Sequence, residues 1–193
     1  MPIQLTAIVG LLFLAASVCA QAPRVVMTTN LGTIELELDD QKAPVTSANF
    51  IKHVGNGHYN GTIFHRVISN FMIQGGGYTP ELERREAGDS IDNEADNGLK
   101  NLRGTIAMAR TQDPHSAQAQ FFINVVDNDF LDHTGKTLRG WGYAVFGRVV
   151  EGMDVVDRIK ALSKTARGPF QNLPVDPAII IKAEMKPAAE KGN

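Results

Sequence analysis

The side chains best suited to chemistry lie together in the segment from Phe64 to Gly76. Its sequence, Phe-His-Arg-Val-Ile-Ser-Asn-Phe-Met-Ile-Gln-Gly-Gly, places the cation Arg66 a few residues from the apolar Phe71 and Met72 and from the amide Gln74. A guanidinium stays protonated in proteins and only donates hydrogen bonds. An isolated arginine is more often a solvated surface charge, so the role of Arg66 depends on its surroundings.

Motifs for bond-breaking chemistry are missing from the rest of the sequence. Ser69 and Ser116 do not stand in a Gly-x-Ser-x-Gly pattern, and the one cysteine, Cys19, falls in a segment that we expect to be removed. The histidines show no His-Glu-x-x-His spacing; they are His53, His58, His65, His115 and His133. We therefore expect neither a hydrolase nor a metal site, and no cofactor.

The segment Phe64–Gly76 closely resembles the signature of the cyclophilins, which are peptidyl-prolyl isomerases. Further motifs of that family follow along the chain in the family's order: the opening hairpin, the helix at Pro44, and the segments 104–109, 120–123, 130–131 and 145–147. The resemblance implies a closed antiparallel β-barrel capped by two α-helices. It also implies cis–trans isomerisation of X-Pro bonds in unfolded or flexible polypeptides.

The chemistry of X-Pro rotation explains why those residue types suit the task. Rotation costs about 18 to 20 kcal/mol because amide resonance is lost, but no bond breaks. The enzyme therefore needs only a surface that favours the twisted amide over both planar forms. As the bond twists, the proline nitrogen regains its lone pair and becomes a hydrogen-bond acceptor. The resemblance makes Arg66 the catalytic donor to that nitrogen.

The resemblance also implies a set of substrate-binding residues. Apolar members would hold the proline ring and exclude water, so that the donor acts at low dielectric. Gln74 and Gln120 would orient the substrate backbone and Arg66, while Ala109 and Arg110 would line the peptide groove mainly through their backbone. The predicted set is His65, Phe71, Met72, Gln74, Ala109, Arg110, Gln120, Phe122, Phe130, Leu131 and Tyr143.

Two members of this set depart from the pattern of many eukaryotic cyclophilins. Phe130 stands where they carry a tryptophan, and Tyr143 stands where they carry a histidine, a pairing that resembles bacterial exported members. Because phenylalanine lacks the indole N–H donor, we expect catalysis to survive and cyclosporin to bind only weakly.

A second function, from a different class, is compatible with the same residues. A proline-binding chaperone module would hold X-Pro peptides without accelerating rotation, and composition does not separate it from an enzyme. Arg66 does, because its loss should abolish most turnover and leave much of the ring-binding pocket intact.

The sequence pattern predicts that a mainly β fold positions these residues. Ile34, Leu36 and Leu38 alternate with polar residues in the second strand of an opening hairpin. Helices are expected from Pro44 to about residue 54 and from about Met153. Many short strands with only two helices favour a capped antiparallel barrel. The expected strands are 24–29, 33–38, 62–67, 71–74, 105–108, 120–125, 144–150 and 178–186.

The polar stretch 78–103 is expected to be a long loop, which is either a substrate wall or a surface excursion. Residues 1–20 carry no charged side chain and end with Val18 and Ala20 at the −3 and −1 positions of a signal-peptidase site. We expect cleavage near Ala20, leaving a domain over 21–193 with a short polar tail; a membrane anchor is the alternative.

The charge and the destination of the chain restrict its partners. The formal net charge of −2 over 193 residues gives no support to a nucleic-acid partner. The bacterial-like Phe130 and Tyr143 favour the periplasm over a eukaryotic secretory lumen. We expect a monomer that acts on proline-containing polypeptides, with no stable membrane insertion after cleavage.

Overall fold

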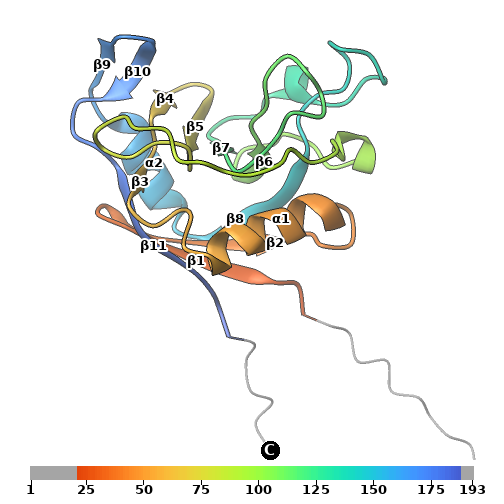
Figure 1. Ribbon diagram of the computed structural model, residues 1–193, viewed down its shortest axis with the longest axis horizontal. Helices are drawn as coiled ribbons and strands as arrows, with labels where there is room; N and C mark the ends of the chain where they lie inside the picture. The colour runs from red at the N-terminus through yellow and green to blue at the C-terminus, as the bar shows by residue number, and fades with distance from the viewer. Residues whose placement is uncertain (1–20, 188–193) are drawn as a thin grey trace, which may run out of the picture.

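The computed structural model describes residues 21–187, so the predicted signal peptide lies outside the described residues. Nine antiparallel strands form one curled sheet in the order β3-β11-β1-β2-β8-β6-β7-β5-β4 (Figure 1). The strands of this sheet are β1 (Arg24–Thr29), β2 (Gly32–Leu38), β3 (Thr62–Ile63), β4 (Arg66–Ile68), β5 (Met72–Gly75), β6 (Thr105–Met108), β7 (Phe121–Asn124), β8 (Val145–Glu151) and β11 (Ile179–Met185).

The expectation of a mainly β fold with two helices is confirmed, but the barrel is not strictly closed. Strands β3 and β4 are the two edges of the sheet, and the chain links them directly through Phe64 and His65. The single strand expected over 62–67 is therefore two short strands with a break between them. A barrel needs hydrogen bonds around its whole circumference, whereas here the two edges are joined only by the chain.

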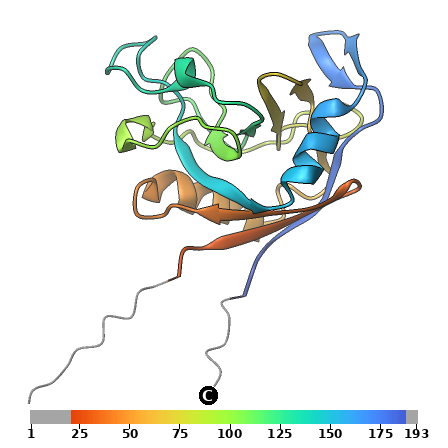
Figure 2. The same ribbon diagram turned by 180° about the vertical axis from the view of Figure 1, so that it is seen from behind.

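The two helices lie apart from each other along the curled sheet (Figures 1 and 2), and buried residues of both belong to the main core inside it. Helix α1 (Pro44–Gly55) packs against β11 and β8, whereas α2 (Met153–Ala161) packs against β2, β4 and β5. The first turn of α1 contains no acidic residue. Instead Glu94, from the long loop, accepts hydrogen bonds from the backbone N–H groups of Val45 and Thr46 at 3.0 and 2.8 Å. Glu94 thereby satisfies two donors that the helix itself leaves free.

Alternation along the strands divides the apolar residues between two clusters on the two faces of the sheet. In β7, Phe121 and Ile123 belong to the main core, together with Phe50 of α1. Phe122, between them, belongs to a second cluster on the other face, as expected because successive side chains of a strand point to opposite sides. The buried members of this outer cluster are Met72, Ala107, Phe122, Leu131 and Val145.

Four further elements were not expected from the sequence. Strands β9 (Lys164–Arg167) and β10 (Phe170–Pro174) form a separate hairpin that projects from the body of the molecule (Figure 1). Short 3-10 helices, η1 (Ala95–Asn97) and η2 (Asp129–Leu131), interrupt the loops. Segment 78–103 is otherwise irregular, as expected. Within residues 21–187, no helix is long and apolar enough to cross a membrane.

Candidate active site on the outer face of the sheet

One row of cross-strand partners brings the predicted catalytic residue to the outer apolar cluster. Arg66 of β4 pairs with Gln74 of β5, and Gln74 pairs with Phe122 of β7. Phe122 in turn pairs with Ala107 of β6, which pairs with Val145 of β8. Because paired residues project from the same face of a sheet, the cation, the amide and the aromatic ring share one surface.

The guanidinium of Arg66 is exposed and held at one side by uncharged groups. Its Nη1 donates to Oε1 of Gln74 at 3.4 Å, and Nε2 of Gln74 donates to Oε1 of Gln120 at 3.0 Å. Its central carbon lies 5.8 Å from the centre of the Phe71 ring. Among residues 21–187 it takes part in no ion pair within 4.0 Å. Most of its donors therefore stay available to an incoming ligand.

The apolar residues beside Arg66 form a floor with an aromatic rim. Met72 and Phe122 are only 2% and 4% exposed, and Leu131 is also buried. Phe71 and Phe130 stack with their centroids 5.4 Å apart, and Phe130 is 76% exposed. On the other side of this floor, the ring of Tyr143 meets Phe122 edge-on at 5.6 Å. The floor and rim suit a small apolar ring such as that of proline.

A pocket begins at Gln74, in the row of cross-strand partners, and extends away from the apolar floor. Four predicted residues line it: Gln74, Ala109, Arg110 and Gln120. The sequence had left the role of segment 78–103 open, and the structure places Arg84, Arg85 and Ala87 of that segment on the wall of the pocket. Other lining residues that the sequence did not indicate include Thr111, Ser116 and Gln118. The long loop is therefore a wall of the candidate site.

Gly77 lets Gln120 lie close to the backbone of this loop. A Cβ atom on Gly77 would stand 2.5 Å from the amide of Gln120, closer than real Cβ contacts allow. The absence of a side chain at residue 77 thus makes room for the Gln74–Gln120 hydrogen bond that supports Arg66.

His65 is placed apart from the other predicted residues. Its ring lies 4.7 Å from that of Tyr78 and 6.2 Å from that of Phe170, and neither residue belongs to the predicted set. Burial lowers the pKa of His65 to about 4, so the ring is neutral at pH 7. Its role in substrate binding stays a prediction. Over the described part of the chain, no three His, Cys, Asp or Glu side chains gather as a metal site.

Buried asparagines behind the floor are residues that sequence reasoning missed. Nδ2 of Asn128 donates to the carbonyl of Phe71 at 2.9 Å and to Oδ1 of Asn124 at 2.7 Å. Nδ2 of Asn124 donates to Oδ1 of Asn101 at 3.2 Å. Asn101 donates in turn to Asp132, which follows Phe130 and Leu131 in the chain. The network fixes both halves of the rim. Three asparagines near predicted strands gave no motif from which it could have been found.

Solved structures with the same fold are cyclophilins. A cyclophilin type peptidyl-prolyl cis-trans isomerase of Cryptosporidium parvum superposes with a TM-score of 0.71 at 26% identity, covering 86% of this chain and 99% of that one. A second structure of it, in the presence of the dipeptide Ala-Pro, gives a TM-score of 0.69 at 26% identity and covers the same shares of the two chains.

Bacterial relatives are much closer in sequence. Peptidyl-prolyl cis-trans isomerase cyp18 of Streptomyces antibioticus is 58% identical over 82% of this chain and 96% of its own length. Isomerase B of Escherichia coli is 57% identical over 79% of this chain and 93% of its own length. The model of the family described as cyclophilin type peptidyl-prolyl cis-trans isomerase/CLD matches residues 24–185. The chain therefore belongs to the cyclophilin-type peptidyl-prolyl cis-trans isomerase family.

Proposed function

We propose that this isomerase rotates X-Pro bonds at the row Arg66–Gln74–Phe122, with Arg66 as the donor that recognises the twisted amide. The family and the names of its relatives establish the peptidyl-prolyl isomerase activity. Each relative described above is named an isomerase, and nothing favours the non-catalytic proline-binding alternative. The roles of Arg66, Gln74 and Phe122 in that activity are proposed from the geometry of the site.

The proposed mechanism uses only binding and one hydrogen bond. The proline ring rests on Met72 and Phe122, and the substrate carbonyl lies near the guanidinium of Arg66. As the C–N bond turns, the nitrogen becomes pyramidal and accepts a hydrogen bond that it could not accept in either planar form. A donor fixed in advance toward a charge or lone pair that develops only in the transition state contributes about 100- to 1000-fold to the rate.

One observation carries the proposal: the same row holds Arg66 and Phe122 on one face, with the uncharged Gln74 between them. Arg66 is therefore fixed next to an apolar floor without a carboxylate among residues 21–187 to occupy its donors. The related cyclophilin of Cryptosporidium parvum was crystallised in the presence of an X-Pro dipeptide, Ala-Pro, which supports a ligand of this size for the family's fold.

Replacement of Arg66 by alanine tests the proposal and separates it from the binding alternative. We expect kcat/KM for an X-Pro peptide to fall by about two to three orders of magnitude, with little loss of peptide affinity in an NMR titration. Arg158→Ala removes an exposed arginine of α2 that pairs with Asp154, and should leave turnover unchanged. Equal rates for Arg66→Ala and the wild type would refute the assignment.

We also propose that cyclosporin binds this enzyme only weakly. The exposed rim residue Phe130 offers a ring but no N–H donor. Phe130→Trp restores that donor, so we expect it to tighten cyclosporin binding in a fluorescence or calorimetric titration. Nanomolar binding by the wild type would contradict this proposal.

The proposed place of work is the bacterial periplasm, where the enzyme would assist the folding of exported proteins as a monomer. The support is the uncharged N-terminal segment with Val18 and Ala20 before the expected cleavage site, together with the bacterial-like Phe130 and Tyr143. Expression of the full chain in a bacterium should yield a periplasmic protein that begins at Gln21 and sediments as a monomer. Full-length protein held in the membrane fraction would contradict the proposal.

A further inference from the structure

A second cleft adjoins the candidate site on the side of Tyr143. Its lining residues, which together we call the Arg139 cleft, are Arg110, Thr111, Gln112, Asp113, Leu138, Arg139 and Tyr143. Tyr143 belongs to both regions, because its ring also meets Phe122 of the apolar floor at 5.6 Å. A polypeptide bound at the floor could therefore extend directly into the cleft.

The loop over residues 133–142, which forms one wall of the cleft, is internally braced. Trp141 packs between His115 and His133, with ring centroids 5.0 and 5.4 Å away. Backbone hydrogen bonds close the loop, from the N–H of Thr134 to the carbonyl of Gly140 at 2.8 Å and from Trp141 to Thr137 at 3.0 Å. The loop thus has a fixed shape that can present side chains at its tip.

The tip presents one apolar and one cationic side chain to solvent. Leu138 is 72% exposed, and Arg139 beside it is also exposed. An exposed leucine alone needs no explanation. Next to an arginine, on a braced loop that faces a cleft, it supplies a contact surface for an aliphatic stem that ends in a charge.

The charges that line the cleft favour an anion. The guanidinium of Arg110 is fixed by donating to the carbonyls of Gly142 and Thr111, both at 2.9 Å, and it lies 4.5 Å over the ring of Tyr143. Neither Arg110 nor Arg139 has a carboxylate within 4.0 Å in the described part of the chain. Asp113 is the single acidic lining residue, and its Oδ1 accepts the N–H of His115. Two guanidiniums thus outweigh one carboxylate.

We propose that the Arg139 cleft is a subsite for an acidic side chain of the polypeptide substrate, a short distance along the chain from the proline. This inference rests on the proposed site at Arg66 and Phe122, and it adds a substrate preference to it. Arg139 contributes the free charge, Leu138 contacts the aliphatic stem of the bound glutamate, and Asp113 limits the strength of the attraction.

A peptide scan tests the subsite. In a short host peptide with one X-Pro bond, Glu replaces Gln at each other position in turn, and kcat/KM is measured for every pair. At one position we expect Glu to be preferred about threefold to fivefold, as for an exposed ion pair. The preference should shrink as salt is added, because the Debye length is only about 8 Å at 0.15 M ionic strength.

Three variants separate the subsite from general electrostatics. Arg139→Gln should return the Glu-to-Gln ratio at that position to about one, and Asp113→Asn should raise it above the wild-type value. Lys52→Gln makes the same change of net charge on exposed α1 and should leave the ratio unaltered. A ratio near one at every position in the wild type, or an unchanged ratio in Arg139→Gln, would overturn the proposal.

The single tryptophan gives a readout independent of turnover. Trp141 lies in the braced loop, so the Glu peptide should change its fluorescence more than the Gln peptide does, in both the wild type and Arg66→Ala. Equal changes for the two peptides would count against the subsite. If Arg66→Ala abolishes isomerisation while the ratio test fails, the active site stands and only the subsite is refuted.

Discussion

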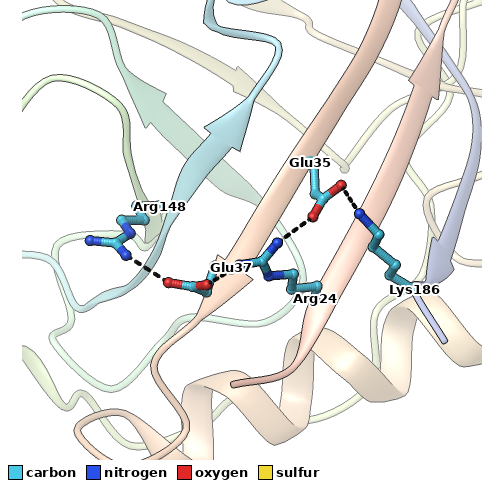
Figure 3. Close-up of polar contacts among 5 residues, drawn as sticks. All are labelled: Arg24, Glu35, Glu37, Arg148 and Lys186. Atoms are coloured by element: carbon cyan, nitrogen blue, oxygen red, sulfur yellow. Dashed lines mark hydrogen bonds and ion pairs between the residues drawn. The ribbon is translucent and has the colours of Figure 1, made fainter. Parts of the chain in front are cut away.

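Two arginines of the same sheet meet opposite electrostatic surroundings. Arg24 of β1 lies between two carboxylates, with Nη1 3.0 Å from Glu35 and Nη2 2.7 Å from Glu37 (Figure 3). Glu37 also binds Arg148 at 2.7 Å, and Glu35 binds Lys186 at 2.6 Å. Arg66 of β4 has the neutral Gln74 as its cross-strand partner. The five residues of Figure 3 are called the ion-pair chain below.

The difference shows how one residue type serves structure or chemistry according to its cross-strand partner. In β1 and β2, Arg24 stands opposite Glu37, so its charge is neutralised when the strands pair. In β4 and β5, Arg66 stands opposite an amide that can support a guanidinium but cannot neutralise it. A cation whose donors are already bound to carboxylates has little left for a substrate, whereas one beside an amide keeps most of its donors.

The most direct test of this difference between the two arginines is to give Arg66 the electrostatic surroundings of Arg24. Gln74→Glu places a carboxylate opposite Arg66, where it should bind the guanidinium and withdraw it from the substrate. We expect kcat/KM in the X-Pro isomerisation assay to fall by about ten- to a hundredfold, part of the cost of losing one fixed donor. The isosteric neutral change at the adjacent glutamine, Gln120→Met, should cost less. Full activity in Gln74→Glu would contradict the importance of an unpaired cation.

The candidate site around Arg66 also depends on the buried asparagines behind the apolar floor. Asn128→Ala leaves the carbonyl of Phe71 and Oδ1 of Asn124 without their donor. We expect the free energy of unfolding to fall by about 2 kcal/mol, measured by urea denaturation, because buried polar groups lose their partner. Activity should fall with the looser rim. A variant as stable as the wild type would show that water replaces the lost amide.

The ion-pair chain should affect stability and leave catalysis alone. Glu37→Gln removes the carboxylate that joins Arg24 to Arg148. We expect a loss of about 1 kcal/mol in the free energy of unfolding, as for a partly exposed pair within a network, which lowers Tm by about 2 to 4 °C for a domain of this size. Calorimetry and the isomerisation assay on the same sample check both halves. A large loss of activity at unchanged Tm would contradict the purely structural role of Glu37.

The smallest expected effect is the pH dependence of this stabilisation. The hydrogen bond from Lys186 lowers the pKa of Glu35, and the hydrogen bond from Arg24 lowers the pKa of Glu37. A carboxylate with a lowered pKa stabilises the fold above its unfolded value, about 4.3, and this stabilisation is lost as the pH falls below that value. The Tm difference between wild type and Glu35→Gln should therefore be constant near neutral pH and shrink below about pH 4.5.

Buried histidines also make the stability of the protein depend on pH. Comparing the wild type with Glu35→Gln cancels this contribution. Burial lowers the pKa of His53 and His65 from 6.5 to about 4, so both proteins lose stability as the pH falls across that range. Because the loss is common to the wild type and Glu35→Gln, only the difference in Tm reports on the ion-pair chain. A difference that persists unchanged at the lowest pH would show that Glu35 acts through packing.

Local patterns were sufficient to predict most of the fold. Alternation in β2 and the proline at the start of α1 placed those elements to within a residue, because each depends on its own side chains. The break between β3 and β4 and the β9–β10 hairpin were missed. Thr62–Val67 reads as one strand-like run. Its interruption is set by pairing with β11 on one side and β5 on the other.

The candidate site was predictable where the family's motif is contiguous and not where it depends on tertiary contacts. Arg66, Phe71 and Gln74 lie in one segment, and the structure joins them to Phe122 through strand register. Two features, the pocket wall at Arg84 and the asparagine network behind the floor, depend on how the loops pack against the sheet. Single residues in polar loops show no spacing from which this packing could be predicted.

The proposed action of Arg66 at the twisted amide can be measured directly by the exchange of a peptide bound to the enzyme. In an NMR exchange experiment, the cis–trans interconversion of a bound X-Pro peptide is followed in the wild type and in Arg66→Ala, at concentrations that saturate both. We predict that exchange slows by about two to three orders of magnitude in the variant, while the peptide stays bound. An exchange rate unchanged by the loss of the guanidinium would contradict the account.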